Sequence, residues 1–272
     1  MLLQNRNAVI YGAGGSLGGE IARSLAKEGA TIFAAGNRLE PVEKIAEEII
    51  NAGGRAEAMK VDALNIKEVN NFVDFIIKKA GGIDISFNLI SLKDLQGVPL
   101  VEMAPDDFTR PLQRAIESHF ITGTSAGRVM IKQRSGVILS LTATPGGISY
   151  PNSGGFGPAC KFIESFSAQL ASELGPHGIR VVNIRSAGSP DSQVFKEAID
   201  QGGAKVQEFI KKIEDDTMLK RMPLMKDIAN TAVFLAGDGA AGITGVTVDV
   251  TCGTSSALNY KLTPIAFIRK PH

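Results

Sequence analysis

The stretch YGAGGSLGGEIA, Tyr11–Ala22, joins a short apolar segment to the start of a segment with helical periodicity. Glycines in such a turn let backbone N–H groups approach a phosphate closely, and the positive end of the following helix attracts the same oxygens. Gly12 is placed for the tight turn and Gly18 for close packing of the helix on the strand. This pattern predicts a nucleotide-binding turn, although a glycine-rich turn taken alone also fits a plain chain reversal.

The same alternation continues along the chain. Seven short apolar segments are expected to be strands, at residues 7–12, 31–36, 56–62, 83–90, 136–142, 179–185 and 245–250. Segments with helical periodicity lie between them, at 17–28, 41–51, 67–80, 106–133, 157–175 and 227–236. Strands that are apolar on both faces are typical of a parallel sheet covered by helices. We therefore expect a three-layer, Rossmann-type, doubly wound parallel sheet of about seven strands.

The composition indicates an ordinary globular protein. With 272 residues and 44% hydrophobic content, we expect one domain over residues 1–253 and a tail, 254–272, that packs on the domain or on a neighbouring subunit. A net charge of +1 with interspersed charges favours a small-molecule substrate over nucleic acid or a membrane surface. The two cysteines form no C-x-x-C pair, so we expect no metal site. We expect the protein to be cytoplasmic.

Several motifs together resemble the short-chain dehydrogenase/reductase superfamily, over residues 5–253. The first turn matches the pattern T-G-x-x-x-G-x-G, with Tyr11 for the threonine and Ser16 for the middle glycine. VDAL (61–64) resembles the segment that contacts adenine, and IDISFNLIS (83–91) resembles I-D-x-L-V-N-N-A-G. ELGPHGIRVVNIRSAGSPDS (173–192) resembles the stretch that ends in P-G-x-x-x-T, and residues 227–253 resemble the closing segment of the family.

This resemblance implies that the chain binds a nicotinamide dinucleotide. The residues expected to hold it are Gly12, Gly14, Ser16, Leu17, Gly18, Asn37, Arg38, Asp62, Ala63, Asn88, Lys161, Gly188 and Ser192. An acid after the second strand would bind the ribose hydroxyls of NAD, whereas a basic side chain favours the 2′-phosphate of NADP. No acid occurs there before Glu40, and Arg38 follows Asn37, so NADP(H) is favoured over NAD(H).

The family's catalytic residues are mostly replaced. The resemblance implies a lysine that binds the nicotinamide ribose, and Lys161 matches it. The tyrosine that delivers the proton would stand at Gly157, the serine at Ala143 or Thr144, and the asparagine at His119. Because Gly157 has no side chain, the family's proton-transfer step is not carried over to this chain.

Other groups are candidates for that step. His119 has a suitable ordinary pKa near 6.5, Tyr150 lies in the loop beside the expected substrate, and Thr144 has a hydroxyl that can hold a carbonyl oxygen. The alternatives are a packed loop tyrosine, a satisfied buried histidine and a threonine that only packs at a strand end. Backbone N–H groups of the glycine-rich loop 144–157 are a further candidate oxyanion site. Lys161, His119, Thr144 and Tyr150 are thus the expected catalytic residues.

Two functions remain open from the sequence. The first is an NAD(P)(H)-dependent oxidoreductase that acts on a carbonyl, alcohol or activated alkene with a non-standard proton donor. The second is a dinucleotide-binding protein without redox activity, either a non-redox enzyme or a non-catalytic subunit. The resemblance also implies a homodimer or homotetramer paired through the segments around 120–130 and 162–174, and the segment 189–222 is expected to form a lid.

Overall fold

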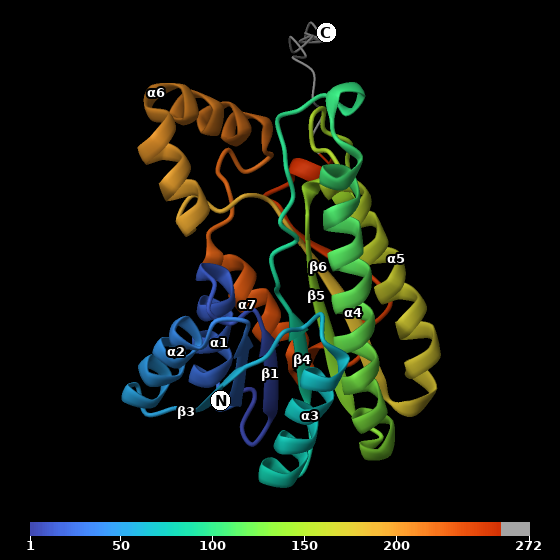
Figure 1. Cartoon of the computed structure of the whole chain (residues 1–272). Coiled ribbons are helices and arrows are strands. Elements are labelled where there is room, and N and C mark those ends of the chain that lie inside the picture. Colours follow the sequence, from blue (N-terminus) through green and yellow to red (C-terminus); the bar gives the residue numbers. More distant parts are fainter. Residues whose placement is uncertain (257–272) are drawn as a thin grey trace, which may run out of the picture.

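The computed structural model of the protein describes residues 1–256, with six positions inside the helix 193–216 and the last residue, Ser256, described by their backbone alone. Its centre is one sheet with the strand order β3-β2-β1-β4-β5-β6-β7, in which every neighbouring pair is parallel (Figure 1). The strands are β1 (Asn7–Tyr11), β2 (Thr31–Gly36), β3 (Arg55–Lys60), β4 (Ile85–Asn88), β5 (Gly136–Ala143), β6 (Ile179–Ser186) and β7 (Thr247–Val250). The direction of winding reverses between β1 and β4, where open α/β sheets bind ligands.

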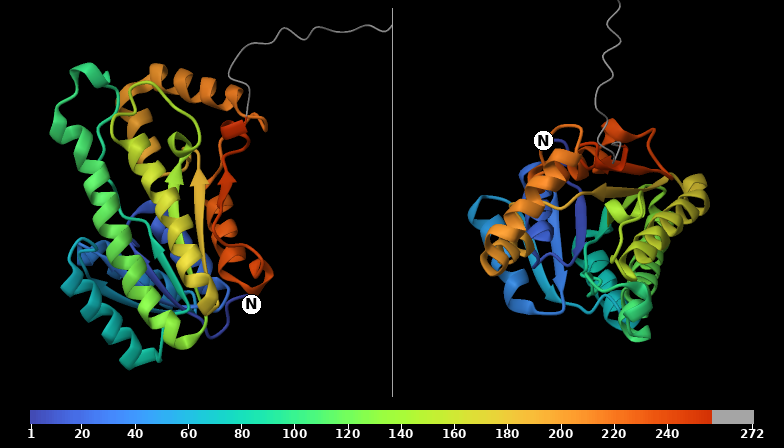
Figure 2. Two further views of the ribbon diagram at one scale, coloured as in Figure 1. Left: turned by 90° about the vertical axis from the view of Figure 1, so that its right-hand side faces the viewer. Right: turned by 90° about the horizontal axis from the view of Figure 1, so that it is seen from above.

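Helices cover both faces of the sheet (Figure 2). They are α1 (Ser16–Lys27), α2 (Leu39–Asn51), α3 (Ile66–Ala80), α4 (Pro105–Gln133), α5 (Phe156–Leu174), α6 (Gln193–Asp216) and α7 (Met225–Ala236). One core packs α1, α2 and α7 against the sheet, and the other packs α3, α4 and α5 against the opposite face. The expected three-layer doubly wound fold is therefore confirmed.

The elements differ from the expected ones mainly at their ends. β4 covers Ile85–Asn88 rather than 83–90, because the Asn88 side chain turns the chain by accepting a hydrogen bond from the Ile90 N–H (3.2 Å). At α3, the Asn65 side chain accepts from the N–H of Lys67 and caps the helix. These local hydrogen bonds, which hydrophobic periodicity does not report, decide where the two elements end or begin.

The expected lid contains a long helix with a break. Ser192 caps α6 by accepting from the Phe195 N–H (3.5 Å), and Gly203 inside it has φ 53° and ψ −135°. This conformation is accessible essentially to glycine alone, so α6 consists of two helical pieces joined at that residue.

Parallel strands bring their carboxyl ends to one edge of the sheet. Here that edge carries Tyr11, Gly36, Lys60, Asn88, Ala143, Ser186 and Val250 as the last residues of β1 to β7. β5 and β6 pair over their whole length, from Gly136 with Ile179 to Ala143 with Ser186. The connections that leave this edge are the ones to which the sequence assigns cofactor and substrate contacts.

Candidate cofactor and substrate site

The glycine-rich turn after β1 is packed closely enough to exclude side chains. Gly12 has φ +84°, and its N–H donates to Ala35 O at 2.8 Å, which ties the turn to the end of β2. A Cβ at Gly18 would stand 2.2 Å from Gly12 O, so only glycine lets α1 approach the turn. The first turn of α1 has no acidic residue, and its free N–H groups keep their attraction for an anion.

The residues expected to contact adenosine follow β2 and β3. Asn37 and Arg38 are exposed between β2 and α2, and the exposed Lys60 ends β3 in register with Gly36. Asp62 forms a local turn in which its Oδ1 accepts from the Leu64 N–H at 3.0 Å, and Ala63 is buried. Sequence reasoning did not single out Lys60, because its register with Gly36 appears only when the strands are paired.

Asn88 links the glycine-rich turn after β1 to helix α4. It is buried at the end of β4, where its Nδ2 donates to Thr122 Oγ1 on α4 at 3.1 Å. The next residue, Leu89, donates its N–H to Tyr11 O at 2.9 Å, and its carbonyl lies 2.6 Å from where a Cβ of Gly12 would be. Asn88 is thus fixed beside the glycine turn.

Lys161 and Gly157 lie one turn apart on α5, as the sequence predicts. Lys161 is exposed and Gly157 is buried. A Cβ at Gly157 would meet Ser153 Oγ at 3.4 Å and Pro145 Cβ at 3.7 Å, which are ordinary contact distances. The backbone at 157 therefore accommodates a side chain, and Ser153 is the polar group nearest to it, a residue that the sequence did not single out.

The loop between β5 and α5 carries two of the expected catalytic residues. Thr144 begins the short 3₁₀ turn Thr144–Gly146, and its carbonyl accepts from the N–H groups of Gly147 and Ile148. Tyr150 is 38% exposed, and its carbonyl accepts from Ser153 Oγ at 3.1 Å. Both side chains belong to the loop that packs beside Gly157.

His119 lies inside the protein, on α4. Its Nδ1 is 3.0 Å from Ala115 O, which requires the proton on Nδ1 and leaves Nε2 as an acceptor. Nε2 has no partner among the described residues and borders a cavity of about 10 Å³, lined by polar groups that include Asn88, Thr122 and Ser140. Burial lowers the pKa of His119 to about 4, because an imidazolium there would lose its hydration. The imidazole is therefore neutral at pH 7, which disfavours the expected role as an acid.

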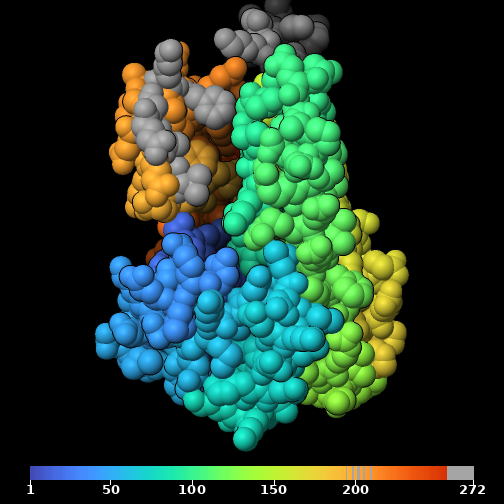
Figure 3. Space-filling model, in the orientation of Figure 1, coloured from blue at the N-terminus to red at the C-terminus, as the bar shows by residue number. Residues whose placement is uncertain are grey.

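The start of α6, in the segment expected to form a lid, contacts the helix that follows the glycine turn. The Gln193 N–H at the beginning of α6 donates to Ser16 Oγ at 3.4 Å. A Cβ at Gly188 would stand 2.2 Å from the Phe195 ring, so any side chain there would have to displace that ring. Figure 3 shows the molecule hollowed between α6 and the chain that leads into α4, above the N-terminal part of the fold.

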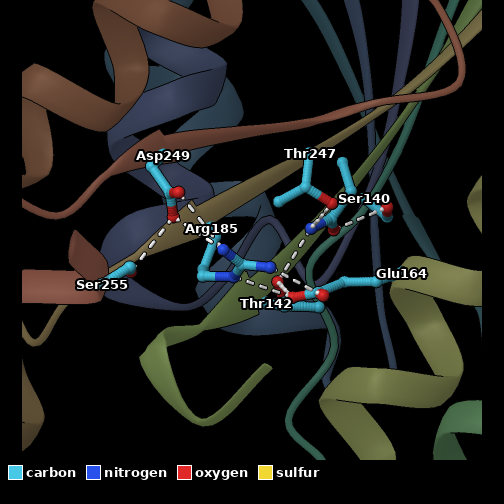
Figure 4. A network of polar contacts seen from close by, with 8 residues as sticks. Ser140, Thr142, Glu164, Arg185, Thr247, Asp249 and Ser255 are labelled. Carbon is cyan, nitrogen blue, oxygen red and sulfur yellow. Dashed lines mark hydrogen bonds and ion pairs between the residues drawn. The ribbon is translucent and has the colours of Figure 1, made fainter. Parts of the chain in front are cut away.

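A polar network under the β5–α5 loop was not foreseen from the sequence (Figure 4). Arg185 on β6 forms ion pairs with Glu164 on α5 (2.8 Å) and with Asp249 on β7 (3.0 Å). A charged residue inside a strand that is buried on both faces is the signal that would have found it, because such a charge requires a partner.

Residues 1–256 offer no metal centre and no membrane-spanning helix. Within that range, no three histidine, cysteine or acidic side chains come together as a metal ion would require. None of the helices described there has the length and apolar character needed to cross a lipid bilayer.

The sequence of the chain is similar to a family model and to known proteins. Residues 12–255 match a family model described as enoyl-(acyl carrier protein) reductase. The chain is 28% identical over 256 residues to an uncharacterized oxidoreductase, YxjF, of Bacillus subtilis, covering 90% of this chain and 96% of the relative. It is also 28% identical over 257 residues to the 7alpha-hydroxysteroid dehydrogenase of Escherichia coli K12, covering 94% and 97%.

The fold is also found in solved structures. Sorbitol-6-phosphate 2-dehydrogenase SrlD from Erwinia amylovora superposes with a TM-score of 0.85 at 24% identity, covering 91% of this chain and 98% of the other. At this level of identity the likeness concerns the fold.

Proposed function

The chain belongs to the short-chain dehydrogenase/reductase superfamily, and on that premise we propose that it is an NADP(H)-dependent oxidoreductase. Its substrate would be a small molecule with a carbonyl, an alcohol or an activated alkene. When bound, the dinucleotide supplies or accepts the hydride in this chemistry.

The residues at the first turn fit a dinucleotide. The observation that supports the proposal most is the lack of room for a side chain at Gly18, where a Cβ would stand 2.2 Å from Gly12 O. A turn this tight, followed by a helix without acids in its first turn, suits a pyrophosphate. Gly14, Leu17 and Gly188 complete the set proposed to surround it, with Ser192 at the lid.

The adenosine end is proposed to select NADP(H). Arg38 and Lys60 provide two exposed cations at neighbouring strand ends, and a 2′-phosphate would pair with them. Asp62 and Ala63 would border the adenine. At the other end, the Lys161 ammonium is proposed to donate hydrogen bonds to the nicotinamide ribose, with Asn88 close to the turn.

The proton step points to a particular kind of substrate. Reduction of a carbonyl creates an alkoxide that needs an acid at once, and neither Gly157 nor the neutral His119 supplies one. Reduction of an activated alkene places the hydride on the β carbon and the electron pair on the carbonyl oxygen. The oxygen of the resulting enolate is a weaker base than an alkoxide oxygen, so hydrogen bonds can stabilise it until water protonates the α carbon. We therefore favour an activated alkene, in keeping with the description of the matching family model.

Thr144 and Tyr150 have a smaller role in this proposal. Each hydroxyl would donate a hydrogen bond to the substrate oxygen and would not itself lose the proton. His119 would act indirectly, by holding the polar cavity beside Asn88 and Thr122 in order.

The test is consumption of NADPH in the presence of a panel of enones, ketones and aldehydes. We expect turnover with enones to exceed turnover with matched saturated ketones. His119→Ala should change the rate much less than Lys161→Ala does. Tight NADPH binding without turnover on any substrate would instead support the non-redox alternative.

We also propose that the chain forms a homodimer or homotetramer through α4 and α5. Ile116 and Phe120 on α4 are 44% and 53% exposed. The ring of Phe120 lies 6.3 Å from Phe166, which stacks on Phe162 at 5.8 Å, so the two helices present one aromatic face. Of the expected tail, residues 257–272 lie outside the described residues.

A further inference from the structure

The Arg185 guanidinium is bound on all of its sides. Its Nε and Nη2 donate to the two carboxylate oxygens of Glu164 at 2.9 and 2.8 Å, and its Nη1 donates to both oxygens of Asp249 at 3.0 and 3.2 Å (Figure 4). The side chains of Arg185 and Glu164 are 13% and 12% exposed. Hydrogen bonding to Glu164 raises the pKa of Arg185, so the guanidinium keeps its charge.

The same carboxylate is also fixed from the sheet. Thr142 Oγ1 on β5 donates to Glu164 Oε1 at 3.0 Å and accepts from the Asn183 Nδ2 on β6 at 2.8 Å. Glu164 follows Lys161 by three residues on α5, so the two share one side of the helix. The network therefore sets the position of the helical turn that carries the lysine relative to two strands.

The loop beside Gly157 rests on this ion pair. A Cβ at Gly146 would stand 2.0 Å from Glu164 Oε1, and one at Gly147 would stand 2.9 Å from Arg185 Nη1. Pro145 in the same turn is the contact of Gly157 described above. The ion pair thus lies directly against the turn that borders the candidate substrate position.

Stability alone does not account for this arrangement. Taking two charges out of water carries a desolvation cost that their attraction only partly returns, and apolar pairs of similar size often stabilise a core as well or better. An ion pair with several hydrogen bonds fixes the relative orientation of its two side chains, whereas an apolar pair does not.

We propose that Glu164 and Arg185 are positioning residues that hold α5 and the 144–147 turn where Lys161 reaches the nicotinamide ribose. This inference rests on the proposed binding of a dinucleotide. The inference goes beyond the proposed function because it assigns a role to two residues that are not proposed to touch the cofactor or the substrate.

The test compares two probes on the full chain. NADPH carries the nicotinamide, whereas adenosine 2′,5′-bisphosphate carries the adenosine and the 2′-phosphate without it. Glu164→Gln removes the charge, and the double variant Glu164→Leu/Arg185→Met replaces the pair by apolar side chains that should fold. We expect each to weaken NADPH binding by about tenfold, as losing one charged hydrogen bond would, and to leave binding of the bisphosphate unchanged.

A double-mutant cycle with Lys161→Ala distinguishes an effect on the position of Lys161 from a general loss of structure. If the pair acts through the lysine, the double variant should weaken NADPH binding no further once Lys161 is alanine. Asp84→Asn, which breaks the half-buried Arg6–Asp84 pair at the opposite edge of the sheet, should leave both affinities unchanged.

Three results would overturn the inference: equal weakening of both probes, losses that add to that of Lys161→Ala, or unchanged NADPH binding. Failure of the unaltered chain to bind either probe would overturn the proposed function itself, and the inference with it.

Discussion

At residue 157 the protein has a backbone that accepts a side chain but carries none. The contacts that a Cβ would make there begin at 3.4 Å, whereas at Gly155, two residues earlier, a Cβ would stand 1.9 Å from Phe108 O. The two glycines therefore have different origins. Packing requires glycine at position 155 and does not require it at position 157.

This difference predicts that alanine at position 155 lowers the stability of the protein much more than alanine at position 157. Gly157→Ala should change the free energy of unfolding by no more than about 1 kcal/mol, because a helical alanine is at least as favourable as glycine. Gly155→Ala should cost about 2 to 3 kcal/mol through overlap with the Phe108 carbonyl. Urea unfolding of the two variants measures this, and equal losses in both would show that packing constrains the two positions alike.

His119 predicts a pH dependence of stability. Its folded pKa of about 4 is below the unfolded value near 6.5, so its contribution is complete above pH 6.5 and is lost as the pH falls through 4. Between pH 7 and 4.5, the protein should lose about 2 kcal/mol relative to His119→Gln. Denaturant unfolding at a series of pH values measures the difference, and a difference that stays constant with pH would show that His119 is not buried as described.

At the scale of elements, the approach of α1 to β1 depends on a single missing side chain. Gly18→Ala would place a Cβ 2.2 Å from Gly12 O, which should push the helix outward and lower stability by about 2 kcal/mol. The displaced turn should also weaken NADPH binding by about tenfold. Gly242→Ala is the matched control, since its Cβ would meet nothing within 4 Å, and it should change neither quantity. Unchanged binding in Gly18→Ala would remove the turn from the proposed site.

The order of the elements was predictable because the hydrophobic periodicity and the glycine and proline residues at element ends agree along most of the chain. All seven expected strands and six expected helices occur, with ends moved by local hydrogen bonds such as that of Asn88. The break at Gly203 in α6 was not predictable, because a glycine in a helical pattern does not by itself state its φ and ψ.

The positions of the candidate site residues were predictable only where they depend on sequence motifs. The glycine turn follows β1 and Asn88 ends β4, at the carboxyl edge of the sheet, and Lys161 lies near the start of α5, which follows β5. The Glu164–Arg185–Asp249 network joins residues 21 and 64 positions apart, and only the packing of α5 on β6 and the pairing of β6 with β7 bring them together. The protonation of His119 likewise depends on its burial, which one side chain's identity does not reveal.

At the scale of the whole molecule, the exposed face of α4 and α5 predicts self-association. Phe120→Glu should place a charge in the aromatic face and shift the protein to a monomer in sedimentation experiments. Ile77→Glu on α3, where the native side chain is 39% exposed, should leave the association state unchanged. A protein that is monomeric before any substitution would remove this face as an interface.

The whole chain is proposed to retain a dinucleotide site although its resemblance to the family implies Gly157 at the position of the tyrosine. A titration of the full chain with NADPH and with NADH, followed by cofactor fluorescence, measures this retention. We predict saturable binding of both, tighter for NADPH by about tenfold or more because of the cations after β2 and β3. Absence of binding would contradict the retained site, and equal affinity for the two would contradict the preference for NADP(H).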